Sequence, residues 1–460
     1  MKTRPVLPGA LTGLAVCCSA LVCAQTPVAA PVASATLVEG TAYVTRADGR
    51  QSILARGTAL GVGDALSTTR NSTVRLRFTD GGETALRPDS RITVQEYNYV
   101  RDNPQNDSLV LSLLRGGLRA ITGSIGKRGN VDAYKLNVST ATIGIRGTDY
   151  TARLCNNDCK SDSEPIARNT RPNSGAPVIA RVVQAQGSVS VERDNRQIEI
   201  GQGAPLYATD KVATTSGSSA VLAFRDDTRI TLNSGTQLAL TQFSYDPVQP
   251  VRGTMLFQLL SGGLRVATGL IGKSAPRMVK FQTSTATIGI RGTVFDLSCG
   301  KGGAGDDPQP ADVTDVECTE SLYASTRVGE ITLTAADGRE LAVPAGQSGL
   351  VAGQGTARPL QTTPAFFNGL STPTPETVDV NMEQLFGGGG VPADTSGVYL
   401  MVREGKVVMG QSGQMIALDA GESAFAGQSL APVRLANTPI LLDRDPALSN
   451  RAFNFNICRP

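Results

Sequence analysis

The string ATIGIRGT occurs twice in this chain, and this repeat constrains the fold more than any other feature of the sequence. It spans residues 141–148 and 286–293. Two shorter strings, Leu-Leu-x-Gly-Gly-Leu-Arg and Gly-Lys, accompany each copy in the same order and end at Arg119, Lys127, Arg265 and Lys273. Because the spacing between the copies stays nearly constant, we predict a tandem duplication with modules at 36–155 and 180–299.

Polar and apolar residues alternate along several segments of both modules. Thr73–Phe78, Lys135–Ser139 and Ile230–Leu240 have this period of two, which is the pattern of half-buried β-strands. The chain contains 50 glycines, 5% aromatic residues and no tryptophan, a composition that fits short strands joined by tight turns. We therefore predict an all-β fold in which each module is a sandwich or a β-solenoid-like coil.

Turn-rich segments divide the rest of the chain. A polar segment with prolines predicts a linker at 160–176. Glycine turns between alternating strands predict a trailing β-hairpin at 322–356 and a C-terminal β-hairpin region at 398–460. Between them, 361–397 contains several prolines and a run of glycines, so we predict a flexible linker or long loop there.

The N-terminus has the features of a secretory signal peptide. Lys2 and Arg4 precede a short apolar run, Leu11–Val22, and small residues end at Ala24. We predict that residues 1–24 are cleaved off and that the mature chain is periplasmic or secreted. A lipidated or uncleaved leader is the alternative. Since no later apolar stretch approaches the ~20 residues of a membrane helix, we predict no membrane span in the mature chain.

Cysteines follow the repeated string in both modules. An exported chain favours local disulfides, which predicts the pairs Cys155–Cys159 and Cys299–Cys318 and leaves Cys458 without a partner. A metal site is not predicted, because the chain has no histidine and no second cysteine pair stands near Cys155.

Composition excludes several classes of chemistry. The absence of histidine removes Ser-His-Asp and Cys-His nucleophiles as well as imidazole metal ligands. We therefore predict a protein that is not an enzyme and that carries no cofactor. With 43 basic and 40 acidic residues the net charge is only +3, so nucleic acid is not a predicted partner.

The repeated string has two interpretations, and the sequence favours the first. As a structural latch, its glycines permit a sharp bend and its arginine donates to carbonyls freed by that bend. As a ligand site, its two arginines present a fork to a carboxylate or phosphate. The candidate residues are Gly144, Arg146, Gly147 and Thr148 in the first copy and Gly289, Arg291, Gly292 and Thr293 in the second.

Basic residues at matching positions form a second candidate, a basic strip made of Arg119, Lys127, Arg265 and Lys273. Such a strip either touches an anionic envelope polymer or is simply a solvated strand face. The sequence favours the solvated face, since runs of charge usually have that role.

The order of these strings, which follow Phe-x-Asp turns at Phe78 and Phe224, resembles the FecR domain, named for the periplasmic regulator of iron-dicitrate transport. The resemblance covers both modules and implies an all-β periplasmic domain without catalytic residues. In the best-known members this domain senses an outer-membrane transporter and signals through a membrane helix to a cytoplasmic segment that controls a sigma factor. This chain begins with a predicted leader instead of that segment, so the resemblance implies the sensing module and not direct sigma-factor control.

Together these features predict a non-catalytic periplasmic binding or sensing protein whose partner is an envelope protein or a cell-surface polymer. The alternative is a regulatory component of an iron-related or envelope-stress signalling system that acts through a separate membrane partner. Duplication would increase avidity if both modules engage one partner.

Overall fold

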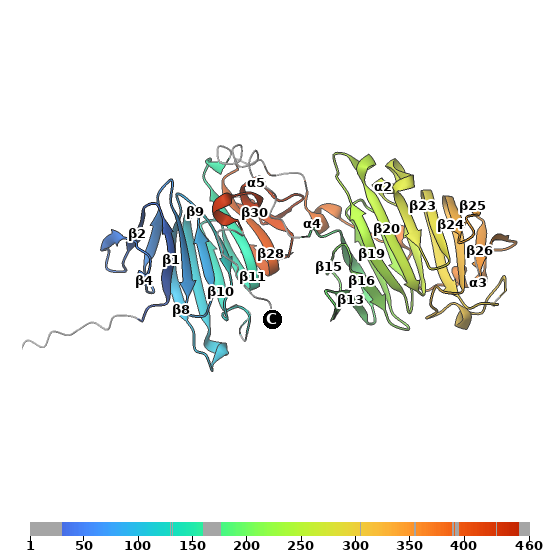
Figure 1. The fold of residues 1–460 in the computed structure, drawn as a ribbon, viewed down its shortest axis with the longest axis horizontal. Coiled ribbons are helices and arrows are strands. Elements are labelled where there is room, and N and C mark those ends of the chain that lie inside the picture. The colour runs from blue at the N-terminus through green and yellow to red at the C-terminus, as the bar shows by residue number, and fades with distance from the viewer. Residues whose placement is uncertain are drawn as a thin grey trace, which may run out of the picture.

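The computed structural model describes residues 30–449, apart from 129, 131, 160–175, 304, 354–355, 389–390, 392–394 and 429. The predicted signal peptide, nearly all of the predicted linker and Cys458 lie outside these residues. The described chain forms two β-rich units side by side (Figure 1), each built on one large sheet. The prediction of an all-β fold is confirmed.

The first sheet contains 15 strands within the described residues. They are β1 (Ala33–Glu39), β2 (Ala42–Thr45), β3 (Gln51–Ile53), β4 (Ala59–Leu60), β5 (Ala65–Thr68), β6 (Thr73–Phe78), β7 (Glu83–Leu86), β8 (Arg91–Asn98), β9 (Ser108–Ile121), β10 (Tyr134–Val138), β11 (Ala141–Cys155), β28 (Gly397–Gln411), β29 (Gln414–Asp419), β30 (Ser423–Gly427) and β31 (Val433–Leu435). We refer to this unit as module 1.

The second sheet contains 16 strands in the part of the chain that the structure describes. They are β12 (Ala180–Gln186), β13 (Val189–Arg193), β14 (Arg196–Glu199), β15 (Pro205–Leu206), β16 (Lys211–Thr214), β17 (Ser219–Phe224), β18 (Arg229–Leu232), β19 (Gln237–Ser244), β20 (Thr254–Ser261), β21 (Gly263–Ala267), β22 (Val279–Gln282), β23 (Ala286–Gly300), β24 (Ser321–Ala335), β25 (Glu340–Pro344), β26 (Ser348–Ala352) and β27 (Thr356–Leu360). We refer to this unit as module 2.

Helices are few and short. They are α2 (Leu270–Ser274), α3 (Ala365–Asn368), α4 (Met382–Phe386) and α5 (Ile440–Asp443), together with the 3-10 turns η1 (Pro104–Asn106), η2 (Pro250–Arg252), η3 (Pro276–Met278), η4 (Pro310–Asp312), η5 (Pro375–Thr377) and η6 (Pro446–Leu448). The segment 361–397 therefore contains α3, η5 and α4. Across the described residues, we find no helix with the length and apolar character needed to cross a membrane.

The C-terminal strands return to module 1. β28 pairs antiparallel with β11 from Gly397 to Gly410, as β24 pairs with β23 inside module 2. The groups β24–β27 and β28–β31 are thus equivalent closing hairpins, one for each module. The chain leaves module 1 after β11, forms module 2, and then comes back to complete module 1 (Figure 1).

Each module has two layers that share long, bent strands. The first half of β9 pairs with β8 and β10, while its second half pairs with β7 and β11. Positive φ angles mark the bends: 78° at Gly116 in β9, 52° at Gly147 in β11 and 82° at Gly405 in β28. In module 2, Gly292 and Gly329 have φ angles of 61° and 78°. Such bends let a strand pass from one layer to the other.

Apolar side chains between the layers form a separate core in each module. The core of module 1 includes Val402, Val407 and Met409 of the returning strand β28. In module 2, the rings of Phe257 and Phe281 lie in contact, with centroids 5.8 Å apart. Since burial of apolar area is the dominant favourable term in folding, β28 is part of what holds module 1 together.

Candidate functional site

The repeated string forms the corner at which β11 and β23 change layers. At this corner, glycines on neighbouring strands face each other. A Cβ atom on Gly405 would lie 2.2 Å from the carbonyl oxygen of Gly147, and one on Gly329 would lie 2.4 Å from that of Gly292. The backbones approach so closely that no side chain fits between them. Gly144 and Gly289 are different, because the atoms nearest to an added Cβ are 3.8 Å and 4.0 Å away.

Threonine makes the side-chain hydrogen bonds at the corner of module 1. The Oγ1 of Thr148 donates to the carbonyl oxygen of Lys406 at 3.0 Å, and its backbone N–H donates to the Oγ1 of Thr122 at 2.8 Å. In module 2, the N–H of Thr293 donates to the Oγ1 of Thr268 at 3.0 Å. The Oγ1 of Thr293 is buried and has no partner among the described residues.

Arg146 and Arg291 lie at the corners with exposed side chains. Neither guanidinium makes a hydrogen bond or an ion pair with a residue that the structure describes. The single hydroxyl proton of Thr148 is instead shared between the carbonyl oxygens of Lys406 and Arg146, and the latter oxygen lies 2.6 Å from the Oγ1 of Thr148. The geometry therefore leaves both arginines available to a ligand, while threonine and glycine hold the bend.

We expect Arg146→Ala and Arg291→Ala each to change the free energy of unfolding by less than about 0.5 kcal/mol, because exposed side chains without partners contribute little. Thr148→Val is expected to cost about 1–3 kcal/mol, since it leaves a carbonyl at the corner unpaired. Urea unfolding of the full chain measures both changes. A loss of more than about 1 kcal/mol in the arginine variants would show that they are latches.

Two residues of the predicted basic strip are buried. Arg119 is 2% exposed and Arg265 is 8% exposed. Arg119 donates from Nε and Nη2 to the carboxylate of Asp149 at 2.8 Å and 2.6 Å. Arg265 donates from Nε to Asp296 at 2.5 Å. Lys127 and Lys273 are exposed, so the four residues do not form one continuous surface.

Arginines around these buried ion pairs also hold the short helices that follow the closing hairpins. Arg119 donates from Nη1 to the carbonyl oxygen of Leu448 in η6 at 3.0 Å. Arg327 donates from Nη2 to that of Phe367 in α3 at 3.1 Å. Burial and the nearby charge of Arg119 lower the pKa of Arg403 to about 10. These arginines have a structural role in each module.

Both predicted disulfides are present. Cys155 and Cys159 are bonded with their Cα atoms 5.6 Å apart, and Cys299 and Cys318 with theirs 4.8 Å apart. The first links the end of β11 to the turn that follows it, and the second links the end of β23 to the residues before β24. Each disulfide therefore lies at the end of the long strand, β11 or β23, that pairs with the closing hairpin of its module.

A buried carboxylate holds the same turn in each module. Asp80 follows β6 and Asp226 follows β17, and both are buried. Asp226 accepts hydrogen bonds from the N–H and Oγ1 of Thr228, at 3.1 Å and 2.8 Å, and from the N–H of Ile271 at 3.2 Å. Burial raises the pKa of both carboxyls above its ordinary value of 3.8, although these hydrogen bonds oppose the shift.

This raised pKa predicts a pH dependence of stability. The folded protein holds the proton of Asp226 more tightly than the unfolded chain, so stability falls as the pH rises from about 4 through the raised pKa. We expect Asp226→Asn to reduce this slope, and Asp80→Asn to reduce it further. Calorimetry across this pH range measures the slope. An unchanged slope in the double variant would contradict the assignment, and Asp48→Asn, at an exposed position, is the control.

The two modules meet at a junction of buried charges. Arg181 of β12 donates from Nη2 to the Oε1 of Glu422, and its Nη1 lies 3.6 Å from the carboxylate of Asp419. The Nε of Arg434 lies 3.1 Å from the same oxygen of Glu422. Burial lowers the pKa of Arg434. One carboxylate of module 1 thus forms ion pairs with two arginines, one from each module.

Two further residues of module 2 bind carbonyl groups of module 1. The hydroxyl of Tyr207 donates to the carbonyl oxygen of Ala420 at 2.8 Å, and Arg225 donates from Nη1 to that of Ala436 at 3.0 Å. The guanidinium of Arg225 also lies 5.3 Å from the ring centre of Phe386 in α4. The junction therefore combines these polar contacts with a small apolar cluster of Val178, Tyr207 and Phe386.

The two copies differ at these positions. Where module 2 has Arg181, Tyr207 and Arg225, the strand register and turn hydrogen bonds place Ser34, Gly61 and Thr79 in module 1. Where module 1 has Glu422 and Arg434, they place Gln347 and Pro359 in module 2. Each module therefore carries the junction side chains only on the side that faces the other module. The two surfaces are complementary to each other.

A cleft of about 670 Å³ lies at the junction and is lined by both modules. Val191, Ile198 and Ile200 come from module 2, while Lys406 and Ile416 come from module 1. The strands β14 and β29 border it, and each pairs with a single neighbour among the described strands. The other edge of β14 carries backbone N–H and C=O groups that are available for pairing. On β29, the carbonyl oxygen of Ala417 accepts from Arg434 at 2.7 Å, and the N–H of Asp419 donates to Glu422 at 2.9 Å.

These features define a class of β protein with duplicated modules and a disulfide in each module. The family model described as FecR protein matches residues 64–164 and 210–314, one region in each module, and the chain carries two tandem copies of the FecR domain. The resemblance predicted from the repeated strings is confirmed. A comparison with curated proteins found no match.

Two solved structures of a candidate anti-sigma factor from Parabacteroides distasonis ATCC 8503 show a weak similarity. Their sequence identities are 15% and 13%, and both have a TM-score of 0.23. Each match covers 33% of this chain and 60% of the other protein. This similarity is too low to assign a fold or a role.

The junction residues were not among the candidates drawn from the sequence. The repeat points to positions at which the copies agree, whereas the junction uses positions at which they differ. An alignment of the two copies reveals that signal, because arginine replaces Ser34 and Thr79 and tyrosine replaces Gly61. At these positions, a charge that is present in one copy and absent from the other marks the contact between the modules.

Proposed function

We propose that this chain is a non-catalytic sensing protein of the cell envelope that binds an envelope protein or polymer. The FecR match supports a signalling and regulatory role, and the two disulfides are in keeping with an exported protein. The observation that carries the proposal is the cleft lined by both modules. Ligand sites occur preferentially at such boundaries between domains.

The cleft combines three features of a recognition site. Its apolar floor includes Val191, Ile198 and Ile200. Charged groups such as Lys406 and Asp419 stand at its margin. The free edge of β14 offers backbone hydrogen bonds to an extended segment. A protein partner that contributes an extended strand uses all three at once.

The experiment compares cleft variants with a matched variant elsewhere. The purified chain is immobilised and exposed to envelope extract and, separately, to purified cell-wall polymer. Ile198→Glu and Ile416→Glu should abolish retention of the partner, because each places a charge on the apolar floor. Ile53→Glu makes the same change on exposed strand β3 at the far end of module 1 and should leave retention intact. Equal retention by all variants would remove the cleft from the proposal.

A second function within the same class is a component of an iron-related or envelope-stress response that acts through a separate membrane partner. The FecR match is the observation that favours it. Deletion of the gene should then change transcript levels under iron limitation or envelope stress. Complementation with the Ile198→Glu variant should fail and complementation with Ile53→Glu should succeed. Unchanged transcripts under both conditions would contradict this function.

A further inference from the structure

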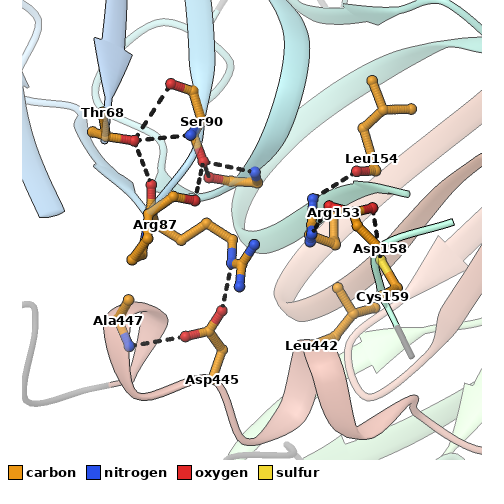
Figure 2. Close-up of polar contacts among 12 residues, drawn as sticks. Thr68, Arg87, Ser90, Arg153, Leu154, Asp158, Cys159, Leu442, Asp445 and Ala447 are labelled. Atoms are coloured by element: carbon orange, nitrogen blue, oxygen red, sulfur yellow. Dashed lines mark hydrogen bonds and ion pairs between the residues drawn. The ribbon is translucent and has the colours of Figure 1, made fainter. Parts of the chain in front are cut away.

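The two modules also differ around the glycine that follows the bend in β9, which is Gly117 in module 1. In module 1, Arg153 stands opposite Gly117 in the β9–β11 ladder, and the N–H of Arg87 donates to the carbonyl oxygen of Gly117. Both arginines cover this glycine, because a Cβ atom on Gly117 would lie 3.0 Å and 3.1 Å from their Cδ atoms. Arg87 is paired with Asp445 at 2.8 Å and Arg153 with Asp158 at 2.6 Å (Figure 2).

Module 2 has small, uncharged residues at the same positions. Ser298 stands opposite Gly263 in the β21–β23 ladder, and the N–H of Asn233 donates to the carbonyl oxygen of Gly263 at 2.9 Å. A Cβ atom on Gly263 would lie 3.1 Å from the Oγ of Ser298 and 3.4 Å from the Nδ2 of Asn233. The space taken by two arginines in module 1 is open here as a cavity of about 250 Å³.

The cavity has an apolar wall and a polar floor. Phe366, Phe367 and Val313 line the wall, and no charged side chain is among its described lining residues. Ser298 is 5% exposed, and its hydroxyl has no hydrogen-bond partner among the described residues. The Oδ1 of Asn233 accepts from the Oγ1 of Thr372 at 2.9 Å, which leaves its Nδ2 donors facing the cavity.

We propose that this cavity is a binding pocket for a small neutral molecule with a flat ring or short acyl body and a carbonyl oxygen. The carbonyl would accept from the hydroxyl of Ser298 and the amide of Asn233, while the body packs against Phe366. A charged ligand is disfavoured, because the pocket has no countercharge to offset its desolvation. The volume is below the ~300–1,000 Å³ of pockets for drug-sized ligands, so the ligand is of fragment size.

This pocket lies under α3 in module 2 and uses none of the residues of the junction cleft. It therefore does not depend on the proposed partner. In module 1, the two arginines fill the space that corresponds to this pocket. Module 1 therefore serves, within the full chain, as a copy of the fold that lacks the pocket.

The test uses acetanilide as a neutral probe, with a phenyl ring and an amide, and benzoate as a charged probe of similar shape. Saturation-transfer NMR and thermal denaturation of the full chain measure binding. We expect acetanilide to bind and to raise the melting temperature, and benzoate to do neither. Failure of acetanilide to bind, or equal binding of benzoate, would overturn the proposal, since the cavity would then hold only water or lack the stated selectivity.

Two variants locate the binding. Asn233→Leu combined with Ser298→Leu fills the pocket and removes its donors, and Phe366→Ala removes one wall at a half-buried position. Each should weaken acetanilide binding at least about tenfold. Phe366→Ala keeps the test valid if the double variant fails to fold. If both variants fold and bind as tightly as the original chain, the probe binds elsewhere and the proposal is wrong.

Discussion

Gly405→Ala is expected to destabilise the chain by about 2–5 kcal/mol. Two terms add up. Alanine at a φ of 82° is strained, and its Cβ would lie 2.2 Å from the carbonyl oxygen of Gly147. The strands β11 and β28 must separate at this point to admit it, which opens the ladder that closes module 1.

Gly413→Ala is the matched control. Gly413 has the same φ of 82°, but nothing lies within 4 Å of an added Cβ atom. Gly413→Ala should therefore lower the free energy of unfolding only by the cost of the strained backbone conformation, about 1–2 kcal/mol. Gly329→Ala and Gly338→Ala repeat the comparison in module 2. Calorimetry of the full chain resolves these losses, and equal losses within each pair would contradict the close approach of the two strands.

Glu422→Gln is expected to cost about 3–5 kcal/mol and to loosen the contact between the modules, because it leaves two buried arginines without their shared carboxylate. The side chain of Glu422 is 1% exposed, and those of Arg181 and Arg434 are 4% and 13% exposed. Asp419, at 3.6 Å from Arg181, compensates in part. Glutamine is also the residue that module 2 has at the equivalent position, Gln347, so the shape of the turn is preserved.

Calorimetry and small-angle scattering test this second prediction together. The variant should unfold at a lower temperature and should have a larger radius of gyration as the modules move apart. Asp48→Asn removes an exposed partner of Arg50 and should leave both the unfolding temperature and the radius of gyration close to those of the original chain. Unchanged scattering and a stability equal to that of Asp48→Asn would show that Glu422 does not join the modules.

Local features of the sequence predicted a large part of the fold. Alternation of polar and apolar residues indicated β-strands, and the repeated strings indicated two modules of one family. The disulfides Cys155–Cys159 and Cys299–Cys318 were predicted because they are close in sequence. Each of these inferences depends on residues a few positions apart or on a comparison of one copy with the other.

Burial of the candidate residues was not visible in the sequence. Arg119 and Lys127 share a basic character, yet Arg119 is ion-paired inside module 1 and Lys127 is on its surface. The partner of Arg119 is Asp149, 30 residues away. The repeat identified the corner correctly as a place of special backbone conformation, but only the structure shows that Thr148 makes its hydrogen bonds and that Arg146 is exposed.

The sequence by itself determined the β class, the duplication, the disulfides and the family, because periodicity and repetition are properties of neighbouring residues and matching strings. The tertiary structure decided that the C-terminal strands complete module 1, that matched charges join the modules, and that the space under α3 in module 2 is open where module 1 has two arginines. These features depend on contacts such as that of Thr148 with Lys406, 258 residues apart. No local pattern specifies such a pairing, because it forms only when strands that are far apart in the sequence are brought together in the folded chain.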